Sequence, residues 1–586
     1  MTDPLDWGLQ AKFRDFRGET HKVSTDVVAR VMEAMGAEPN PPSDGPIVIR
    51  RGQTKAIKDA VRVETEGGGS TQLDDGRLPP DVPLGYHSIV RRDGGTQTLI
   101  VSPGSCFLPE DLNVWGFGVQ LYSARSNRSW GIGDLGDLLR LGNWAKRAGA
   151  GVLLLNPLHA SRPRIPQEPS PYSPSSRCFK NVLYIDIDAL PTPERDRDSI
   201  DLLAEKARRL NALDAIDRDA AYRLKLEALE QLWKTADRTT EDFKRYCAES
   251  GELLSDFATF MSAAEGRGKE RVDFHIWVQW MLDEQLERAS QTINLIHDMA
   301  IGVDPDGADS WLWEDTFVSG VAIGAPPDEF NSLGQNWGMR PFDPWKLRSS
   351  GYEPFIRTIR ACMRGAAGLR IDHIMWLFRL WWIPDGHDPS EGVYVHYPHD
   401  DLLDILALES HRAGCYVVGE DLGTVDPLVR KEMHARNILS TKLMWFEGSP
   451  PEDYPELSFA AVTTHDLPTV AGLWTGTDLK EQQGFGVEPD VQANQRLRAE
   501  LRDRLDLKDD APVEEVTAAV YRSLAKAPSR VVIATLEDAL GVHKRPNLPG
   551  TVDRPNWSLP LPVPIDELDN HPLARSVTRA LVEGRS

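Results

Sequence analysis

The stretch Gly368-Leu-Arg-Ile-Asp372 is a short hydrophobic run that ends in a carboxylate. Two further runs end in the same way, Cys415-Tyr-Val-Val-Gly-Glu420 and Phe459-Ala-Ala-Val-Thr-Thr-His-Asp466. Each has the length and composition of a buried strand. An α/β barrel builds its active site from residues at the carboxyl ends of successive parallel strands. The three runs therefore predict such a barrel, with the three acids in its active site.

From residue 115 onward the chain alternates between strand patterns and helix patterns. Most of the strand candidates are apolar on both faces, as expected for a parallel sheet that is covered by helices. Eight strand–helix units make a (β/α)8 barrel of the TIM type. The eight predicted strands are residues 116–122, 151–157, 293–302, 368–373, 415–420, 440–445, 459–464 and 530–536.

The region before the barrel has a different pattern. A helical spacing over residues 23–35 is followed by short alternating runs that turn-rich pieces separate, which is typical of antiparallel strands. We therefore expect an N-terminal domain over residues 1–110, a short helix plus a small β-sandwich. The catalytic barrel then takes residues 111–586. Its second and third strands are too far apart for one crossover, and the sequence between them is rich in helix formers, so we expect a helical insertion over residues 190–290.

Composition excludes several classes of partner. A chain of 586 residues is long for one ordinary domain, which fits a large barrel with insertions. The net charge of −23 repels phosphate backbones and anionic lipids, so we expect no nucleic-acid and no membrane partner. The five cysteines are scattered and form no CxxC pair, and the first residues show no signal-peptide pattern. These features predict a cytoplasmic protein, and they leave its oligomeric state open.

Two of the acids suit the two roles of a retaining glycosidase, which needs a nucleophile and a general acid/base. Arg370 lies two residues before Asp372, on the same side of the predicted strand, and would keep that carboxyl group ionised as a nucleophile requires. The alternative is a structural ion pair. Glu420 has Asp421 as a neighbour and would face Asp372, so repulsion would raise its pKa. The alternative is helix capping, which fits Asp421 better than Glu420.

The third acid, Asp466, follows His465. It can stabilise positive charge on the sugar or bind two hydroxyl groups, whereas the alternative is an N-cap for a helix that opens at Pro468. Metal sites are less well supported. His396 and His399 lack a further ligand at suitable spacing, and the calcium-like loop at residues 303–309 lacks the glutamate at position 12. No nucleotide-binding motif is present either, so no nucleotide site is indicated.

Several further motifs accompany the three acids. They are Ser129-Trp-Gly-Ile-Gly-Asp134, Asn156-Pro-Leu-His159, Ser170-Pro-Tyr-Ser-Pro-Ser-Ser176, Gly324-Ala-Pro-Pro-Asp328, Gly334-Gln-Asn-Trp-Gly338, Tyr394-Val-His-Tyr-Pro398, Leu406-Ala-Leu-Glu-Ser410, Gly419-Glu-Asp-Leu-Gly423 and Arg545-Pro-Asn-Leu-Pro-Gly-Thr551. Through them the chain resembles the 4-α-glucanotransferases of the amylomaltase, or disproportionating enzyme, type in glycoside hydrolase family 77. It looks closest to the bacterial maltodextrin-pathway branch with an N-terminal β domain.

The resemblance implies roles for individual residues. Asp372 would be the nucleophile, Glu420 the acid/base and Asp466 the stabiliser of the transition state. The family needs no metal or organic cofactor. The residues implied to contact the substrate are Arg370, His465 and Tyr172 at the cleavage point, Asp328, Phe330 and Trp337 on a flexible loop over the acceptor side, and Ser170, His373 and Asn547 in the matching motifs.

The implied activity is transfer of α-1,4-glucan segments between maltodextrins, so the partners would be maltooligosaccharide donors and acceptors. One alternative is an α-1,4-glucan hydrolase of the α-amylase clan. Another is a catalytically inactive, carbohydrate-binding barrel. A loop that excludes water and holds an acceptor favours transfer, and residues 325–340 are the candidate. The role of the N-terminal region stays open among glucan binding, packing on the barrel and association.

Overall fold

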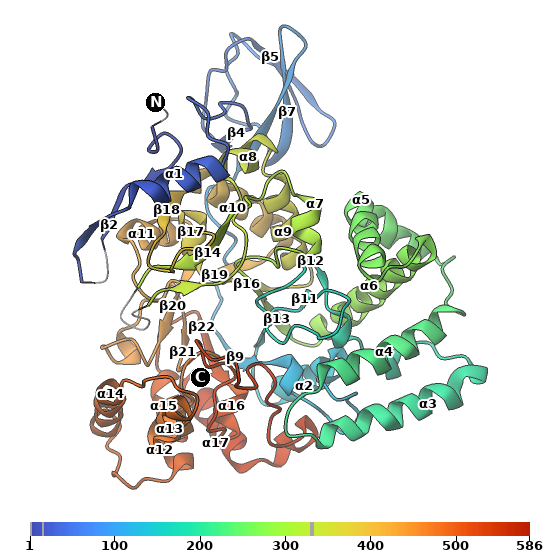
Figure 1. Ribbon diagram of the computed structural model, residues 1–586, viewed down its shortest axis with the longest axis vertical. Coiled ribbons are helices and arrows are strands. Elements are labelled where there is room, and N and C mark those ends of the chain that lie inside the picture. The colour runs from blue at the N-terminus through green and yellow to red at the C-terminus, as the bar shows by residue number, and fades with distance from the viewer. Residues whose placement is uncertain (1–2, 15–16, 328–332, 586) are drawn as a thin grey trace. The chain divides into compact units, whose positions relative to one another are not determined.

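The computed structural model describes residues 3–14, 17–327 and 333–585 of the 586-residue chain (Figure 1). The chain divides into two compact units. One comprises residues 1–109 and 299–440, and the other comprises residues 110–298 and 441–586. Within the described residues no helix has both the length and the apolar character needed to cross a membrane.

Eight parallel strands close into a barrel, and all eight strands expected from the sequence take part in it. The prediction of a (β/α)8 barrel is therefore confirmed. Strands such as β16 and β19 are buried along their whole length, which explains why their sequences are apolar without alternation. In order around the barrel the strands are β9 (Val114–Val119), β10 (Val152–Leu155), β13 (Asn294–Met299), β16 (Gly368–Ile371), β19 (Tyr416–Gly419), β20 (Ile438–Leu443), β21 (Ser458–Ala461) and β22 (Val531–Thr535).

Helices between the barrel strands pack against them; α9 contacts β16 and α2 contacts β10, each being the strand that comes next in the chain. In α9 the buried side chains recur at positions 355, 356, 359, 362 and 363, the spacing of one helix face. The helices along the barrel part of the chain are α2 (Leu135–Arg147), α7 (Ala308–Leu312), α8 (Pro344–Ser349), α9 (Glu353–Met363), α10 (His399–Ala413), α11 (Pro427–Ala435), α12 (Val470–Thr475), α13 (Thr477–Gly484), α14 (Val491–Arg504), α15 (Val513–Leu524), α16 (Leu536–Ala539) and α17 (Pro572–Gly584).

The long gap between the second and third barrel strands holds a short ribbon and a set of helices. The ribbon pairs β11 (His159–Ala160) with β12 (Ser176–Lys180). The helices, green in Figure 1, pack in pairs, α3 with α4 and α5 with α6. They match the expected insertion, although its boundaries at 190 and 290 stay a prediction. They are α3 (Glu194–Arg208), α4 (Arg218–Trp233), α5 (Glu241–Ala264) and α6 (Lys269–Ser290).

The N-terminal region forms helix α1 (Thr25–Ala34), which Ser24 caps, and one five-stranded sheet. The expected runs are strands, but β4 pairs parallel with β8, so the sheet is not purely antiparallel. A second layer of a sandwich and the boundary at residue 110 stay predictions. The order in the sheet is β4 (Ile47–Arg50), β8 (Thr96–Ser102), β7 (Gly85–Arg91), β5 (Ala60–Glu64) and β6 (Ser70–Gln72).

This N-terminal sheet packs on barrel helix α10 of the same unit. Arg50 of β4 lies 3.1 Å from Asp404, and the Tyr86 hydroxyl donates to Glu409 at 2.7 Å. Both acids are almost fully buried, so these bonds replace water that the carboxylates lose on folding. Packing on the barrel, one of the three roles left open, is therefore observed.

A second five-stranded sheet was not expected from the sequence. Its strands belong to loops that follow barrel strands, except for β1 near the N-terminus, which pairs with β18. A two-residue strand that pairs with residues almost 400 positions away leaves no local pattern to detect. The order is β1 (Leu9–Gln10), β18 (Val393–His396), β17 (Arg379–Pro384), β14 (Val321–Ala325) and β15 (Gln335–Asn336), and a separate hairpin joins β2 (Lys12–Arg14) to β3 (Thr20–Lys22).

Candidate active site

Arg370 and Asp372 form an ion pair at the carboxyl end of β16, with 3.2 Å between Nη2 and Oδ1. Arg370 is almost buried, and the Asp372 side chain is about one-fifth exposed. The backbone N–H of Asp372 donates to the carbonyl of Met299 at 3.1 Å, which fixes the end of the strand. An adjacent guanidinium favours the ionised carboxylate, the state in which an aspartate acts as a nucleophile.

Glu420 follows the last residue of β19, and its carboxyl group is held from both sides by backbone donors. Oε2 accepts the N–H of His373 at 2.9 Å, and Oε1 accepts the N–H of Leu422 at 2.7 Å. The Glu420 backbone also bonds to Ile371 and Ile374, each at 3.0 Å. The glutamate is therefore fixed beside the turn that contains Asp372.

His373 makes this arrangement possible through an unusual backbone conformation. Its φ of 47° places it in the left-handed region, where a residue other than glycine costs roughly 1–3 kcal/mol. The turn directs its N–H toward Glu420. Burial lowers the pKa of the His373 ring to about 4, so the ring is neutral at neutral pH. The ring meets Trp337 edge-on, with 5.3 Å between the ring centres.

The pKa of Glu420 is raised, as a general acid requires. Its main cause is burial, which disfavours the charged form more than Arg370 and the two N–H donors favour it. Repulsion from Asp421 acts in the same direction as burial but is a smaller effect. The pKa of Glu420 is raised, as expected from the sequence. The expected cause was repulsion between carboxylates, whereas the main cause is burial.

Helix capping by Glu420 or Asp421, the alternative to catalysis, is wrong. The residue that caps α11 is Asp426, whose side chain accepts the N–H of Leu428 at 3.0 Å. Asp421 is buried and instead contacts Arg430 at 3.2 Å and Ser440 at 2.8 Å. It links β19 to α11 and β20, which is a structural role.

Asp466 lies in the other unit, in the loop after β21. Asn547 Nδ2 donates to Asp466 Oδ1 at 2.7 Å, and the N–H of Asn547 donates to the carbonyl of His465 at 3.0 Å. The Asp466 side chain is 43% exposed, so its carboxylate is positioned without being enclosed. The N-cap of α12 is Thr469, so the alternative reading of Asp466 as that cap is also wrong.

Tyr172 packs beside His465 in the same unit. Its hydroxyl donates to Asp298 Oδ2 at 2.6 Å and lies 3.4 Å from His465 Nδ1. The three rings of Tyr172, His465 and Trp557 lie 4.8 to 5.4 Å apart. Sequence reasoning missed two of these residues. Asp298 was detectable as an acid within the third predicted strand, whereas nothing in the sequence indicates that Trp557 reaches this cluster.

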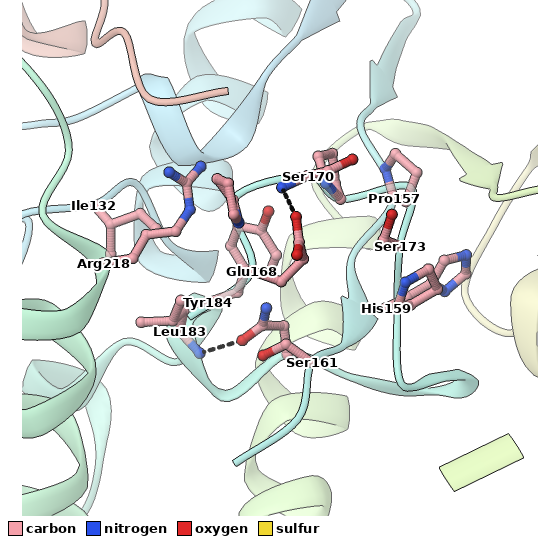
Figure 2. Close-up of a pocket in the computed structure, with 14 residues that line it drawn as sticks. Ile132, Pro157, His159, Ser161, Glu168, Ser170, Ser173, Leu183, Tyr184 and Arg218 are labelled. Atoms are coloured by element: carbon pink, nitrogen blue, oxygen red, sulfur yellow. Dashed lines mark hydrogen bonds between the residues drawn. The ribbon is translucent and has the colours of Figure 1, made fainter. Parts of the chain in front are cut away.

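Ser170 takes part in the turn before Tyr172. Its hydroxyl accepts the N–H of Tyr172 at 3.2 Å, and its own N–H donates to Glu168 at 3.0 Å. Figure 2 shows Ser170 on the wall of a cavity of about 20 Å³, with Arg218 and His159 also around it. That volume holds about one water molecule, not a sugar ring. A direct contact of Ser170 with substrate stays a prediction.

Trp337 is half-buried beside His373. Its indole N–H donates to Gln335 Oε1 at 3.1 Å, and its backbone N–H donates to Ile323 at 2.9 Å. The other two residues predicted on this loop, Asp328 and Phe330, lie outside the described residues, so their placement stays a prediction.

A family model described as 4-alpha-glucanotransferase matches residues 119–271 and 262–565, which is most of the chain. The chain belongs to glycoside hydrolase family 77, the 4-alpha-glucanotransferases. The resemblance inferred from the motifs is thereby confirmed, and so is the enzymatic activity that it implies.

Members of the family match this chain over most of their length. A 4-alpha-glucanotransferase of Mycobacterium tuberculosis is 41% identical over 83% of this chain and 77% of its own. A 4-alpha-glucanotransferase of Haemophilus influenzae is 32% identical over 87% of this chain and 85% of its own. The crystal structure of amylomaltase from Corynebacterium glutamicum covers 98% of both chains, with 30% identity and a TM-score of 0.91. Amylomaltase from Streptococcus agalactiae in complex with acarbose, 20% identical over 80% of this chain and 99% of its own, with a TM-score of 0.66, shares the fold.

Proposed function

We propose that this family 77 enzyme transfers α-1,4-glucan segments between maltodextrins by a retaining double displacement. The observation that carries the proposal is the contrast between two neighbouring carboxyl groups. Arg370 favours the charged form of Asp372, whereas burial raises the pKa of Glu420 and favours its neutral form. When the surroundings of two carboxyl groups favour the charged form of one and the neutral form of the other, the first suits the nucleophile and the second suits the acid.

In the first half-reaction the carboxylate of Asp372 attacks the anomeric carbon of the donor. Glu420 gives its proton to the glycosidic oxygen, the bond to the leaving segment breaks, and an ester joins the sugar to Asp372. Glu420 is left charged, and the N–H groups of His373 and Leu422 then stabilise that charge.

In the second half-reaction Glu420 acts as the base. It takes the proton from the 4-hydroxyl group of an acceptor glucan, whose oxygen attacks the ester carbon and releases Asp372. Two inversions give net retention. Retention requires the carboxyl groups of Asp372 and Glu420 to lie roughly 5–5.5 Å apart, which stays a prediction for this chain.

We assign the remaining predicted residues to binding and charge stabilisation. Asp466 stabilises positive charge on the sugar, and Asn547 orients it by the bond to Oδ1. Arg370 and His465 bind the sugar at the cleavage point. Tyr172 positions the His465 ring against Trp557 and has Asp298 as the acceptor for its own hydroxyl.

Transfer differs from hydrolysis only in what attacks the ester. We propose that the loop bearing Trp337 holds an acceptor sugar and excludes water, which favours transfer. An α-glucan hydrolase would use the same carboxyl groups, and an inactive barrel would use none of them. Maltooligosaccharides are the proposed donors and acceptors. We also propose a cytoplasmic location, which suits five cysteines that are all free thiols.

Product analysis on maltotriose tests the assignment. Transfer gives glucose together with chains longer than the substrate, whereas hydrolysis gives only shorter products. An Asp372→Asn sample at equal concentration controls for contaminating activity. The appearance of maltopentaose with the unaltered chain, and of nothing with the variant, is expected. Shorter products alone would replace the proposal with a hydrolase, and no products would support the inactive barrel.

A further inference from the structure

A groove of about 150 Å³ lies next to the proposed acid/base. Its lining includes His373 and Leu422, the two residues whose N–H groups bind Glu420, and also Trp337. The groove therefore shares two residues with the surroundings of the proposed acid/base, which would activate the acceptor. All of its lining belongs to the unit formed by residues 1–109 and 299–440.

A fixed pair of opposite charges lines this groove. The Arg379 guanidinium lies 4.2 Å from the centre of the Tyr394 ring and donates to Gln10 Oε1 at 3.0 Å. Its Nη2 is 3.9 Å from Asp426 Oδ2. Arg379 is only 20% exposed, so its side chain is already ordered before a ligand arrives. A preorganised donor beside a carboxylate acceptor suits a neutral hydroxyl-rich ligand, because each hydroxyl both donates and accepts.

The N-terminal segment completes the wall of the groove. Gln10 of β1 pairs with Tyr394 of β18, and the Phe13 ring packs edge-on against Trp381 at 4.8 Å. Arg14, one residue further, lines the groove. Its side chain is exposed and forms no ion pair with another described residue. The guanidinium is therefore available to a ligand, and it comes from a part of the chain outside the barrel.

We propose that residues 9–14 complete a subsite for the acceptor glucan. In this subsite Arg14 and the Arg379–Asp426 pair bind hydroxyl groups of a glucose unit beyond the one that receives the transferred segment. Gln10 is a positioning residue, because it acts by holding Arg379. The inference rests on the proposed transfer reaction and adds that the N-terminal segment determines acceptor length. Glucose is a single unit and does not reach this subsite, so the subsite does not strengthen its binding. Maltotriose is long enough to reach it and should bind more tightly because of it.

Acceptor kinetics test this inference. An α-glucosyl fluoride donor is held at saturation, and KM and kcat for transfer are measured with glucose and with maltotriose as acceptors. The variant Arg14→Ala should raise KM for maltotriose by about tenfold, the effect of losing hydrogen bonds to a charged group, with kcat and the KM for glucose unchanged. Gln10→Ala should act in the same direction. Lys22→Ala, an exposed cation on the same hairpin but outside the groove, should change nothing.

The two possible failures are distinguishable. If the unaltered chain transfers to neither acceptor, the proposed function is wrong and this inference fails with it. If the unaltered chain transfers but Arg14→Ala matches Lys22→Ala, or raises the KM for glucose and maltotriose equally, the N-terminal segment only supports β18 and the inference alone is overturned. Equal melting temperatures of the Arg14 and Lys22 variants show that the comparison reports binding and not folding.

Discussion

The N–H of His373 donates to Glu420 Oε2 at 2.9 Å, and His373 follows Asp372 directly in the chain. The proposed nucleophile and the proposed acid/base are therefore tied together by one turn, even though they follow different strands. A displacement of β16 relative to β19 would break this bond. Such a link preserves the distance between two carboxyl groups on which a retaining mechanism depends.

Asp372→Asn is expected to lower turnover by about 1,000-fold or more, because an amide cannot form the glycosyl ester. Its melting temperature should change little, since the side chain is near the surface of the site and Asn keeps its shape. Turnover from maltotriose and thermal unfolding are measured on one preparation. Near-normal turnover with an unchanged melting temperature would show that Asp372 serves only as the ion-pair partner of Arg370.

The raised pKa of Glu420 predicts the pH dependence of catalysis. Glu420 must be protonated to act as an acid, so kcat/KM falls as pH rises through its pKa, and burial moves this fall to higher pH than an exposed glutamate would give. The negative charge of Asp421 contributes to the raised pKa of Glu420. Asp421→Asn should therefore move the fall of kcat/KM to lower pH. Arg430→Ala removes the contact of Asp421 but keeps its charge, and it should not produce that movement. An unchanged profile in Asp421→Asn would contradict this electrostatic account.

Trp337→Ala should increase the ratio of hydrolysis to transfer. The indole packs on His373 beside the proposed acceptor groove, and its loss opens a path for water to the ester. Free glucose and chains longer than maltotriose are quantified in the same reaction. If Trp337 is only a packing residue, the half-buried side chain should instead cost stability when removed, by less than the roughly 3–5 kcal/mol of a fully buried aromatic residue, and the variant should keep the product ratio of the unaltered chain.

Glu537 predicts a pH-dependent contribution to stability. Burial raises its pKa from 4.5 to about 7. A group whose pKa is raised in the folded state contributes most below its unfolded pKa, and that contribution is lost as pH rises toward 7. The loss is about 3 kcal/mol at most. Glu537→Gln should therefore flatten the dependence of the unfolding free energy on pH between the unfolded pKa of 4.5 and the folded pKa of about 7. Exposed Glu583→Gln is the control, and equal slopes in the two variants would refute the assignment.

The barrel strands could be predicted because burial on both faces leaves continuous apolar runs, as in β16 and β19. The second sheet could not be predicted, because its strands pair across large sequence distances. Local spacing placed Arg370 beside Asp372 correctly. Of the two acids weighed as a helix cap, Asp421 fitted better than Glu420, yet the cap of α11 is Asp426, which directly precedes Pro427, a residue suited to the first position of a helix.

The same limit applies to the candidate site. Asp372 and Glu420 directly follow barrel strands, Asp466 lies in the loop after β21, and sequence motifs point to all three. The neighbours of those groups come from remote parts of the chain, as with Trp557 beside His465 and Gln10 beside Arg379. The left-handed turn at His373, which aims its N–H at Glu420, is a tertiary effect that its own sequence does not favour.

The most direct test of the central claim is to trap the glycosyl-enzyme in Glu420→Gln. An α-glucosyl fluoride donor needs no acid for departure, so the ester still forms, but the base that activates the acceptor is missing and the ester accumulates. The account predicts one added glucosyl unit by mass spectrometry, located on the peptide that contains Asp372. The double variant Asp372→Asn, Glu420→Gln should carry none. An adduct on another residue, or rapid turnover of the fluoride without an adduct, would contradict the assignment of Asp372 and Glu420.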